Sequence, residues 1–347
     1  KRMQFKKNLL PTVAGSFTKG VFSILFALLG FGYWSIILGQ LVSAAAGTII
    51  YWSIFPWRPS FHIRKSIIVS LVKYGGHIVL LNLLVAFLLN LDYLFIGRFL
   101  GVEALGVYTL AFRIPDMIIT QFGVIINRVT FPAFVKMRDL ANNFSLGFEV
   151  ALRFIAALIL PVGAGIMLTS APFWQTFFPA NWNEAIPVMR AIAIYTTFSV
   201  LTINAEAVYK AQGTLKTMVG LYLLRLALTI PAMYWAVQTY HSIEAIAWVQ
   251  VGVAIVMSVI NLGIAGRLVH LSFQRILQIL RPSVFSTLIM TIAVWAVLRL
   301  IAPLLSILQL FLAALTGILV YLAVLRWQDQ TILAEGKEVL QRVIRKN

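Results

Sequence analysis

Ten ionisable residues lie inside long apolar stretches of the sequence, where a membrane would tolerate them poorly. Seven are basic and three are acidic, so an excess of four positive charges remains. An ionisable group at membrane depth marks a functional site by default, because it must face protein or a water-filled cavity. Guanidinium offers forked donors and a permanent charge, which suit phosphate. The sequence therefore predicts a central cationic cavity for an anionic, phosphate-bearing ligand, with four substrate-binding candidates: Lys19, Arg113, Arg190 and Arg225.

Position in the apolar runs distinguishes these four cations from the other three basic residues. Three of the four lie at mid-depth, and Arg190 lies on a polar stripe. Lys19, Arg113 and Arg225 lie near the middle of their apolar runs, where a side chain cannot easily reach either surface. Arg190 shares a seven-residue stripe with Thr197 and Asn204, which predicts that it faces the interior. The other three basic residues lie within two turns of the predicted cytoplasmic interface, so we expect them to extend to it. They are Lys73, Arg128 and Arg153.

The acidic residues are candidates for coupling transport to an ion. Asp92, Asp116 and Glu206 are the three carboxylates inside apolar runs, and a carboxylate there can bind a proton or sodium ion. The alternative is that each pairs with an arginine. Arg113 and Asp116 lie one helical turn apart and could neutralise each other.

The composition indicates an all-α polytopic membrane protein. Of the 347 residues 61% are hydrophobic and only 11% are charged, and the mean hydropathy is +0.91. The absence of cysteine excludes disulfides and thiol catalysis. The four histidines are scattered without metal-ligand spacing, and the sequence has neither a Walker loop nor a Gly-rich dinucleotide fingerprint. We therefore expect no cofactor and no metal.

The net charge of +17 is explained by membrane topology rather than by nucleic acid. Ten apolar runs are long enough to span a bilayer. They are 8–31, 33–55, 67–97, 104–135, 148–170, 185–209, 214–238, 242–266, 283–301 and 304–325. With a cytoplasmic N-terminus, 19 Lys and Arg fall in cytoplasmic segments, against only Arg98 and Arg299 in the outer loops. The positive-inside rule then fixes the orientation, with no nucleic acid partner required.

Three amphipathic segments divide the chain. Residues 1–55 hold two helices, 56–66 form an interfacial linker, and 67–270 form a six-helix lobe. Residues 271–347 hold an interfacial helix over 271–281, two further spans and an amphipathic cytoplasmic tail. A six-helix lobe is typical of two-lobed transporters, so about four helices are expected to be missing before residue 1.

Several motifs in order resemble the polysaccharide and O-antigen exporters of the multidrug/oligosaccharidyl-lipid/polysaccharide (MOP) exporter superfamily, which also contains drug exporters. The motifs are LLGFGYWSIILGQL at 28–41, WRP at 57–59, KYGG at 73–76, LDYLFIGRFLGVEALGVYTLAFRIPD at 91–116, NRVTFPAF at 127–134 and PANWNEAIPV at 179–188. The resemblance implies a MATE-like fold of two six-helix lobes with two extra C-terminal helices. It also implies alternating access that flips an undecaprenyl-pyrophosphate-linked oligosaccharide across a bacterial inner membrane.

The leading hypothesis is therefore a flippase and not an enzyme. Its partners would be the lipid-linked oligosaccharide, membrane lipids, a coupling proton or sodium ion, and polysaccharide polymerase and assembly proteins. One alternative is a drug or small-molecule exporter of the same superfamily, which should have an acid-rich cavity. Another is an integral membrane glycosyltransferase or acyltransferase, but no loop here has the polar, carboxylate-bearing character that such an enzyme needs.

Overall fold

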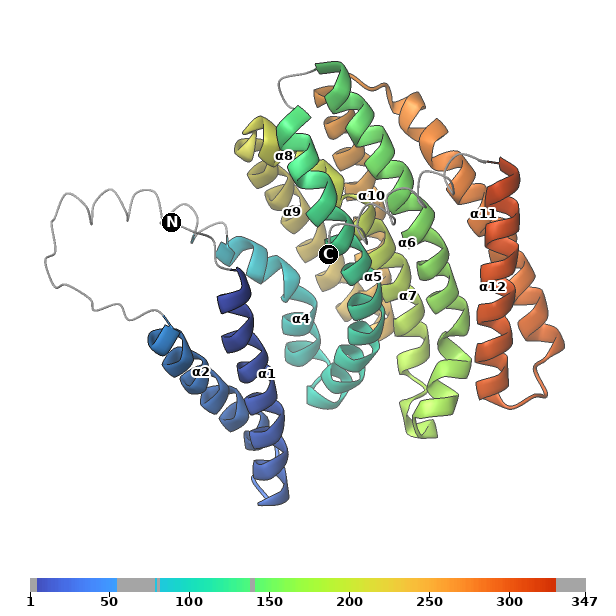
Figure 1. Ribbon diagram of the computed structural model, residues 1–347. Coiled ribbons are helices and arrows are strands. Elements are labelled where there is room, and N and C mark those ends of the chain that lie inside the picture. Colours follow the sequence, from blue (N-terminus) through green and yellow to red (C-terminus); the bar gives the residue numbers. More distant parts are fainter. Residues whose placement is uncertain (1–4, 55–78, 80–81, 138–140, 329–347) are drawn as a thin grey trace, which may run out of the picture. The chain divides into compact units, whose positions relative to one another are not determined.

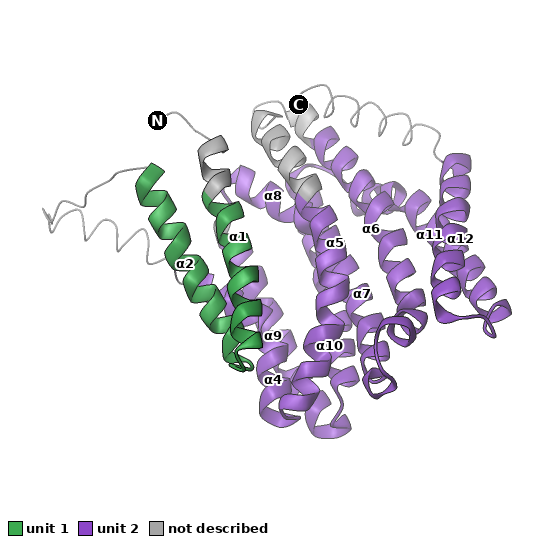
Figure 2. Cartoon of the chain, turned by 60° about the horizontal axis from the view of Figure 1, so that its bottom comes forward, with its two compact units in different colours: residues 1–76 green, residues 77–347 purple. Residues whose placement is uncertain are grey.

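The computed structural model describes residues 5–54, 79, 82–137 and 141–328, with the backbone alone for 5–10, 125–144 and 215. All regular secondary structure in these residues is helical. The chain divides into two compact units, residues 1–76 and residues 77–347 (Figure 2). The first two predicted helices thus fall in unit 1, and the predicted site residues other than Lys19 fall in unit 2.

Unit 1 is a pair of helices, α1 (Phe5–Leu28) and α2 (Trp34–Ile54). Small residues bring the two backbones close together, as is usual where membrane helices pack. The Ser43 hydroxyl donates to the Gly15 carbonyl oxygen at 2.7 Å. A Cβ at Gly39 would overlap the Ser23 side chain and lie 2.9 Å from the Ser23 backbone nitrogen. Gly39 therefore permits an approach that a larger residue would prevent.

Unit 2 is a bundle of long helices (Figure 1). Its elements are α4 (Leu91–Phe99), α5 (Val102–Met137), α6 (Ala141–Phe177), the 3-10 helix η1 (Ala180–Trp182), α7 (Ala185–Leu201), α8 (Ile203–Gln212), α9 (Leu215–Tyr240), α10 (Ile243–Leu268), α11 (Phe273–Leu300) and α12 (Ser306–Gln328). The helix α7 packs against α5, α6 and α10, so it runs through the middle of the unit.

The described helices match the predicted spans closely. Within the described residues, eight helices are long and apolar enough to cross a membrane, with α7 and α8 counted as one span. The segments Asn82–Leu89 and Leu91–Phe99 would add a ninth if this pair, bent by 47°, is one span. The more polar α5 occupies the place of the tenth predicted span. At 36 residues it is about 54 Å long, which exceeds a bilayer's hydrocarbon thickness.

The described residues of unit 2 form three apolar clusters, two toward opposite ends of the bundle and a third where α11 and α12 pack on α6. The inner cluster includes Leu152, Tyr209 and Ile276, and the outer cluster includes Leu91, Trp174 and Ile192. The loops at 98–103 and 171–184 lie at the end of the outer cluster, and the start of α11 lies at the opposite end (Figure 1). These segments thus lie at opposite ends of the bundle, as expected, while the orientation of the bundle in the membrane stays a prediction. The linker at 56–66 and the tail after 328 lie outside the described residues.

The structure differs from expectation at the start of α11. The amphipathic segment 271–281 and the following span form one helix, which contains Pro282. The Ser272 hydroxyl caps this helix by accepting from the backbone N–H of Arg275 at 3.2 Å. The Arg275 guanidinium then forms a two-pronged ion pair with Glu149 of α6, at 3.1 and 2.8 Å. The sequence change from amphipathic to apolar therefore marks no helix boundary.

A close approach of α6 and α7 depends on Gly163. A Cβ added there would overlap the Thr197 hydroxyl and lie 3.4 Å from the Ala193 carbonyl oxygen. The Thr197 hydroxyl is itself fixed, because it donates to that carbonyl at 2.7 Å. Gly165, on the same helix, has no atom within 4 Å of the corresponding position.

We expect Gly163→Ala to destabilise the protein by about 1–3 kcal/mol, because overpacking displaces the buried Thr197. Gly165→Ala should change stability by less than about 0.5 kcal/mol. Adding Thr197→Ala to Gly163→Ala should recover part of the loss, since it removes the atom that is overlapped. Thermal unfolding of the purified protein measures all three. Equal melting temperatures for the two single alanine variants would contradict this account of the α6–α7 contact.

Candidate cavity site

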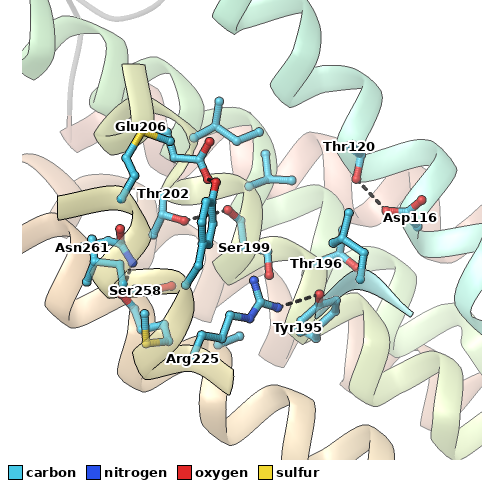
Figure 3. Close-up of a pocket in the computed structure, with 18 of the residues that line it drawn as sticks. Asp116, Thr120, Tyr195, Thr196, Ser199, Thr202, Glu206, Arg225, Ser258 and Asn261 are labelled. Carbon is cyan, nitrogen blue, oxygen red and sulfur yellow. Dashed lines mark hydrogen bonds between the residues drawn. The ribbon is translucent and has the colours of Figure 1, made fainter. Parts of the chain in front are cut away.

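A cavity of about 520 Å³ lies within unit 2, among α4, α5, α7, α8, α9 and α10 (Figure 3). Its wall combines hydroxyls, two amides, two carboxylates and one guanidinium with apolar side chains. The polar residues labelled in Figure 3 are Asp116, Thr120, Tyr195, Thr196, Ser199, Thr202, Glu206, Arg225, Ser258 and Asn261. Such a lining can bind a polar, hydroxyl-rich ligand through many hydrogen bonds.

Arg225 is the cation of this cavity. One of its terminal nitrogens, Nη2, donates to the Tyr195 hydroxyl at 2.9 Å, and its guanidinium carbon lies 5.8 Å from the centre of the same ring. The Nε atom is buried and has no hydrogen-bond partner. Among the described residues, no carboxylate lies within ion-pair distance of Arg225, so its charge is available to a ligand.

The two carboxylates are held by hydroxyl groups. The Thr120 hydroxyl donates to the Asp116 carboxylate at 2.8 Å, one helical turn away. The Tyr222 hydroxyl donates to Glu206 at 3.2 Å, and Lys210 forms an ion pair with the other oxygen of Glu206 at 3.4 Å. The Lys210 pair is substantially exposed, so solvent weakens it. Asp116 is thus held by a hydroxyl, and Glu206 by a hydroxyl and an exposed ammonium group.

A break between α7 and α8 positions several of these groups. The Thr202 hydroxyl donates to the Ser199 carbonyl at 2.8 Å, in the manner of Ser and Thr side chains that bend helices. The Ser258 hydroxyl of α10 donates to the Phe198 carbonyl at 2.9 Å, one residue before Ser199. These bonds fix the end of α7 against α10, and Glu206 then follows on the first turn of α8.

The structure brings together only some of the predicted site residues. Arg225, Asp116 and Glu206 line the same cavity. Lys19 lies on α1 with an exposed side chain, in the other unit. Arg113 and Arg190 do not line the cavity, so the expectation that three arginines share one interior space is wrong. With two carboxylates and one guanidinium, the cavity is also not the cationic chamber that the sequence predicted.

Arg113 lies beside the cavity rather than in it. Its side chain is exposed, and it acts electrostatically on Tyr93, which belongs to the cavity wall. In the described part of the chain, no ion pair joins Arg113 to Asp116, so the self-neutralising alternative is not supported.

Arg190 turns away from the interior. Its Nε donates to the Ser170 hydroxyl of α6 at 3.2 Å, and it lines a separate pocket with Arg299. The predicted stripe misled here because Thr197 and Asn204 are buried in helix packing. The long arginine side chain instead reaches past the flank of α7.

Asp92 forms a buried site of its own, outside the cavity lining. The carboxylate is 1% exposed and accepts from the Tyr108 hydroxyl at 2.7 Å and from the backbone N–H of Tyr93 at 3.0 Å. The buried Gln250 of α10 lies beside it. Among the described residues it has no basic partner within ion-pair distance, so the alternative that it pairs with an arginine gains no support there.

The hydroxyl ligands of the cavity were missed by the sequence analysis. Tyr195 and Tyr222 look like ordinary aromatic residues of apolar helices, and nothing in their spacing links them to Arg225 or Glu206. A search for Tyr, Ser and Thr on the faces of neighbouring helices would have found them only with the packing known. The described residues contain no group of three or more metal-ligating His, Asp or Glu side chains.

Comparisons with known proteins agree with this architecture. TuaB of Bacillus subtilis, a teichuronic acid biosynthesis protein, is 26% identical over 269 residues, which are 74% of this chain and 56% of TuaB. ExoT of Rhizobium meliloti, a succinoglycan biosynthesis transport protein, is 22% identical over 72% of this chain and 50% of ExoT. WzxC of Escherichia coli, a lipopolysaccharide biosynthesis protein, is 28% identical over 46% of this chain and 32% of WzxC. The chain thus spans about half or less of the length of these relatives.

The fold is also found in a solved structure. The lipid II flippase MurJ, in an inward closed conformation, superposes with a TM-score of 0.75 at 16% identity, over 93% of this chain and 68% of MurJ. This likeness shows that the chain shares the helical fold of MurJ. The family described as "Polysaccharide biosynthesis protein" matches residues 1–187, which is more than half of the chain. The resemblance seen in the motifs is thereby confirmed, and the chain belongs to the polysaccharide biosynthesis protein family.

Proposed function

We propose that the whole protein transports a lipid-linked oligosaccharide across a bacterial inner membrane, by alternating access rather than by catalysis. The observation that carries this proposal is the unpaired guanidinium of Arg225 inside a cavity of hydroxyl and amide groups. The hydroxyls suit the sugar, and the guanidinium suits a phosphate or pyrophosphate on the carrier. Family membership and relatives named for polysaccharide biosynthesis support the same substrate class.

The carboxylates of the cavity are proposed to couple this transport to a proton or sodium gradient. Asp116 is held by a neutral hydroxyl, Glu206 is held by a hydroxyl and by the exposed Lys210, and both carboxylates share the cavity with Arg225. A cation that binds one of them changes the field at Arg225, and a phosphate that binds Arg225 changes the cation affinity in return. Asp92 is the further candidate, because it is buried without a basic partner among the described residues. Lys19 and Arg113 remain candidates for substrate contact in other states of the transport cycle.

The second candidate function is export of an organic cation. The cavity lining has two carboxylates and one guanidinium, and an acid-rich lining of this kind is what a drug exporter should have. Family membership and the unpaired Arg225 oppose this function, because a cation site would not place an unpaired arginine on its wall. Cells that express the full-length protein should therefore gain no resistance to cationic dyes while they export oligosaccharide.

We expect Arg225→Ala to weaken oligosaccharide binding by about ten-fold to a hundred-fold, the effect of losing a charge-assisted hydrogen bond. Arg225→Lys should restore part of the activity, because it keeps the charge without the fork. Lys216→Ala is the matched control, since Lys216 is an exposed cation on the same helix. Translocation of labelled lipid-linked oligosaccharide by the reconstituted full-length protein measures each variant. Wild-type transport by Arg225→Ala would remove Arg225 from the substrate site.

Asp116→Asn and Glu206→Gln should each reduce the dependence of transport on an imposed proton or sodium gradient. Each change keeps the shape and the hydroxyl contact but removes the charge that binds the ion. Glu103→Gln serves as the control, because Glu103 is an exposed carboxylate in the first turn of α5. Transport is compared with and without each gradient in vesicles of equal protein content. If both cavity variants keep the wild-type gradient dependence, the coupling role belongs elsewhere, and Asp92→Asn is the next test.

A further inference from the structure

A second pocket of about 480 Å³ opens at the opposite side of α7 from the cavity, where α6 and α7 meet α11 and α12. Its lining includes Arg190, Arg299, Trp295 and Gln309, and no aspartate or glutamate. The pocket lies at the end of the bundle that the positive-inside rule places outside the cell. Two arginines in one acid-free pocket are unexpected there, because only Arg98 and Arg299 fall in the predicted outer loops.

Both guanidinium groups are fixed and still have free donors. Arg190 is anchored through Nε to the Ser170 hydroxyl, so among the described residues its two terminal nitrogens have no partner. The Arg299 guanidinium lies over the Trp295 ring, 5.4 Å from its centre, and makes no hydrogen bond to the described residues. A stacked arginine keeps the N–H groups at its edge available, and this edge matches the oxygens of a phosphate.

The loop beside the pocket is also held in place. The Gln309 amide nitrogen donates to the carbonyl oxygens of Ala302 and Leu304, at 3.0 and 2.9 Å. These bonds tie the first turn of α12 to the loop that follows α11. Arg299 lies in the last turn of α11, directly before this loop.

The surface around the pocket is strongly apolar. Ile292, Trp295, Leu300 and Leu305 are 66%, 53%, 80% and 72% exposed. Side chains of this kind on a membrane helix face acyl chains. A ligand of this pocket must therefore carry both an anionic group and hydrocarbon, which favours a lipid over a soluble anion.

We propose that this pocket binds the phosphate of an anionic phospholipid from the outer leaflet, with Arg190 and Arg299 as the two phosphate ligands. The lipid would fill the junction between the α6–α7 pair and the α11–α12 pair. This site is separate from the substrate cavity and stands independently of the transport proposal.

The test uses the full-length protein in detergent and dioctanoylphosphatidylglycerol as the probe. The double variant Arg190→Gln/Arg299→Gln should bind this lipid at least ten-fold more weakly than wild type, because two charge-assisted hydrogen bonds are lost. Arg98→Gln is the matched control, since it removes the other outer arginine, which is exposed and lies outside the pocket. Its affinity should equal that of wild type. The double variant Arg190→Lys/Arg299→Lys, which keeps both charges, should lie between the two.

Two further ligands identify what the pocket recognises. Dioctanoylphosphatidylcholine should bind more weakly than the anionic lipid, and glycerol phosphate should fail to compete. Unchanged affinity in the Gln double variant, or an equal loss in Arg98→Gln, would overturn the site. Competition by glycerol phosphate as strong as that by the lipid would overturn the lipid as occupant and indicate a soluble anion. Size-exclusion profiles that match wild type establish that each variant is folded, and the Lys variant replaces the Gln variant if the latter is not.

Discussion

Hydroxyl groups, rather than opposite charges, contact three ionisable side chains in the interior of unit 2. Asp92 is held by Tyr108, Asp116 by Thr120, and Arg225 by Tyr195. A tyrosine hydroxyl can donate to a carboxylate or accept from a guanidinium, so one residue type serves both signs. It reduces the penalty of burial without neutralising the charge. An ion pair would stabilise each group but would neutralise the charge that a ligand could bind. A hydroxyl contact leaves that charge free to bind a ligand.

The helix α7 links this polar interior to the inner and outer apolar clusters. Its first half packs into the outer cluster through residues such as Ile192, and its last residues, Val200 and Leu201, belong to the inner cluster. The cavity wall includes Tyr195, Thr196 and Ser199, which lie between these two regions. The break at Thr202 comes directly after them. A ligand that contacts this stretch therefore touches the helix that packs into both clusters.

The sequence predicted the helices well because long apolar runs depend only on local composition. It predicted the cavity less well, because a cavity depends on which faces of distant helices meet. Arg225 was correctly predicted to lie in the interior, because a mid-depth cation without an acidic neighbour on its own helix must face protein or a cavity rather than lipid. Arg190 was not, because a long side chain can leave the stripe on which its Cα lies. Tyr195 and Tyr222 carried no signal at all, since an aromatic residue in an apolar helix is normally part of a core.

The surroundings of the arginines, rather than their charge alone, determine what each can bind. Arg225 stands among hydroxyls, two amides, two carboxylates and apolar side chains such as Leu221 and Met257, so a ligand there meets many hydrogen-bonding groups. Arg190 and Arg299 stand beside exposed apolar side chains without a carboxylate, which favours a lipid phosphate and opposes a sugar. Because the two sites lie on different sides of α7, a lipid bound at one need not compete with an oligosaccharide at the other. Guanidinium groups thus lie both in the interior cavity and in the peripheral pocket, in surroundings of different polarity.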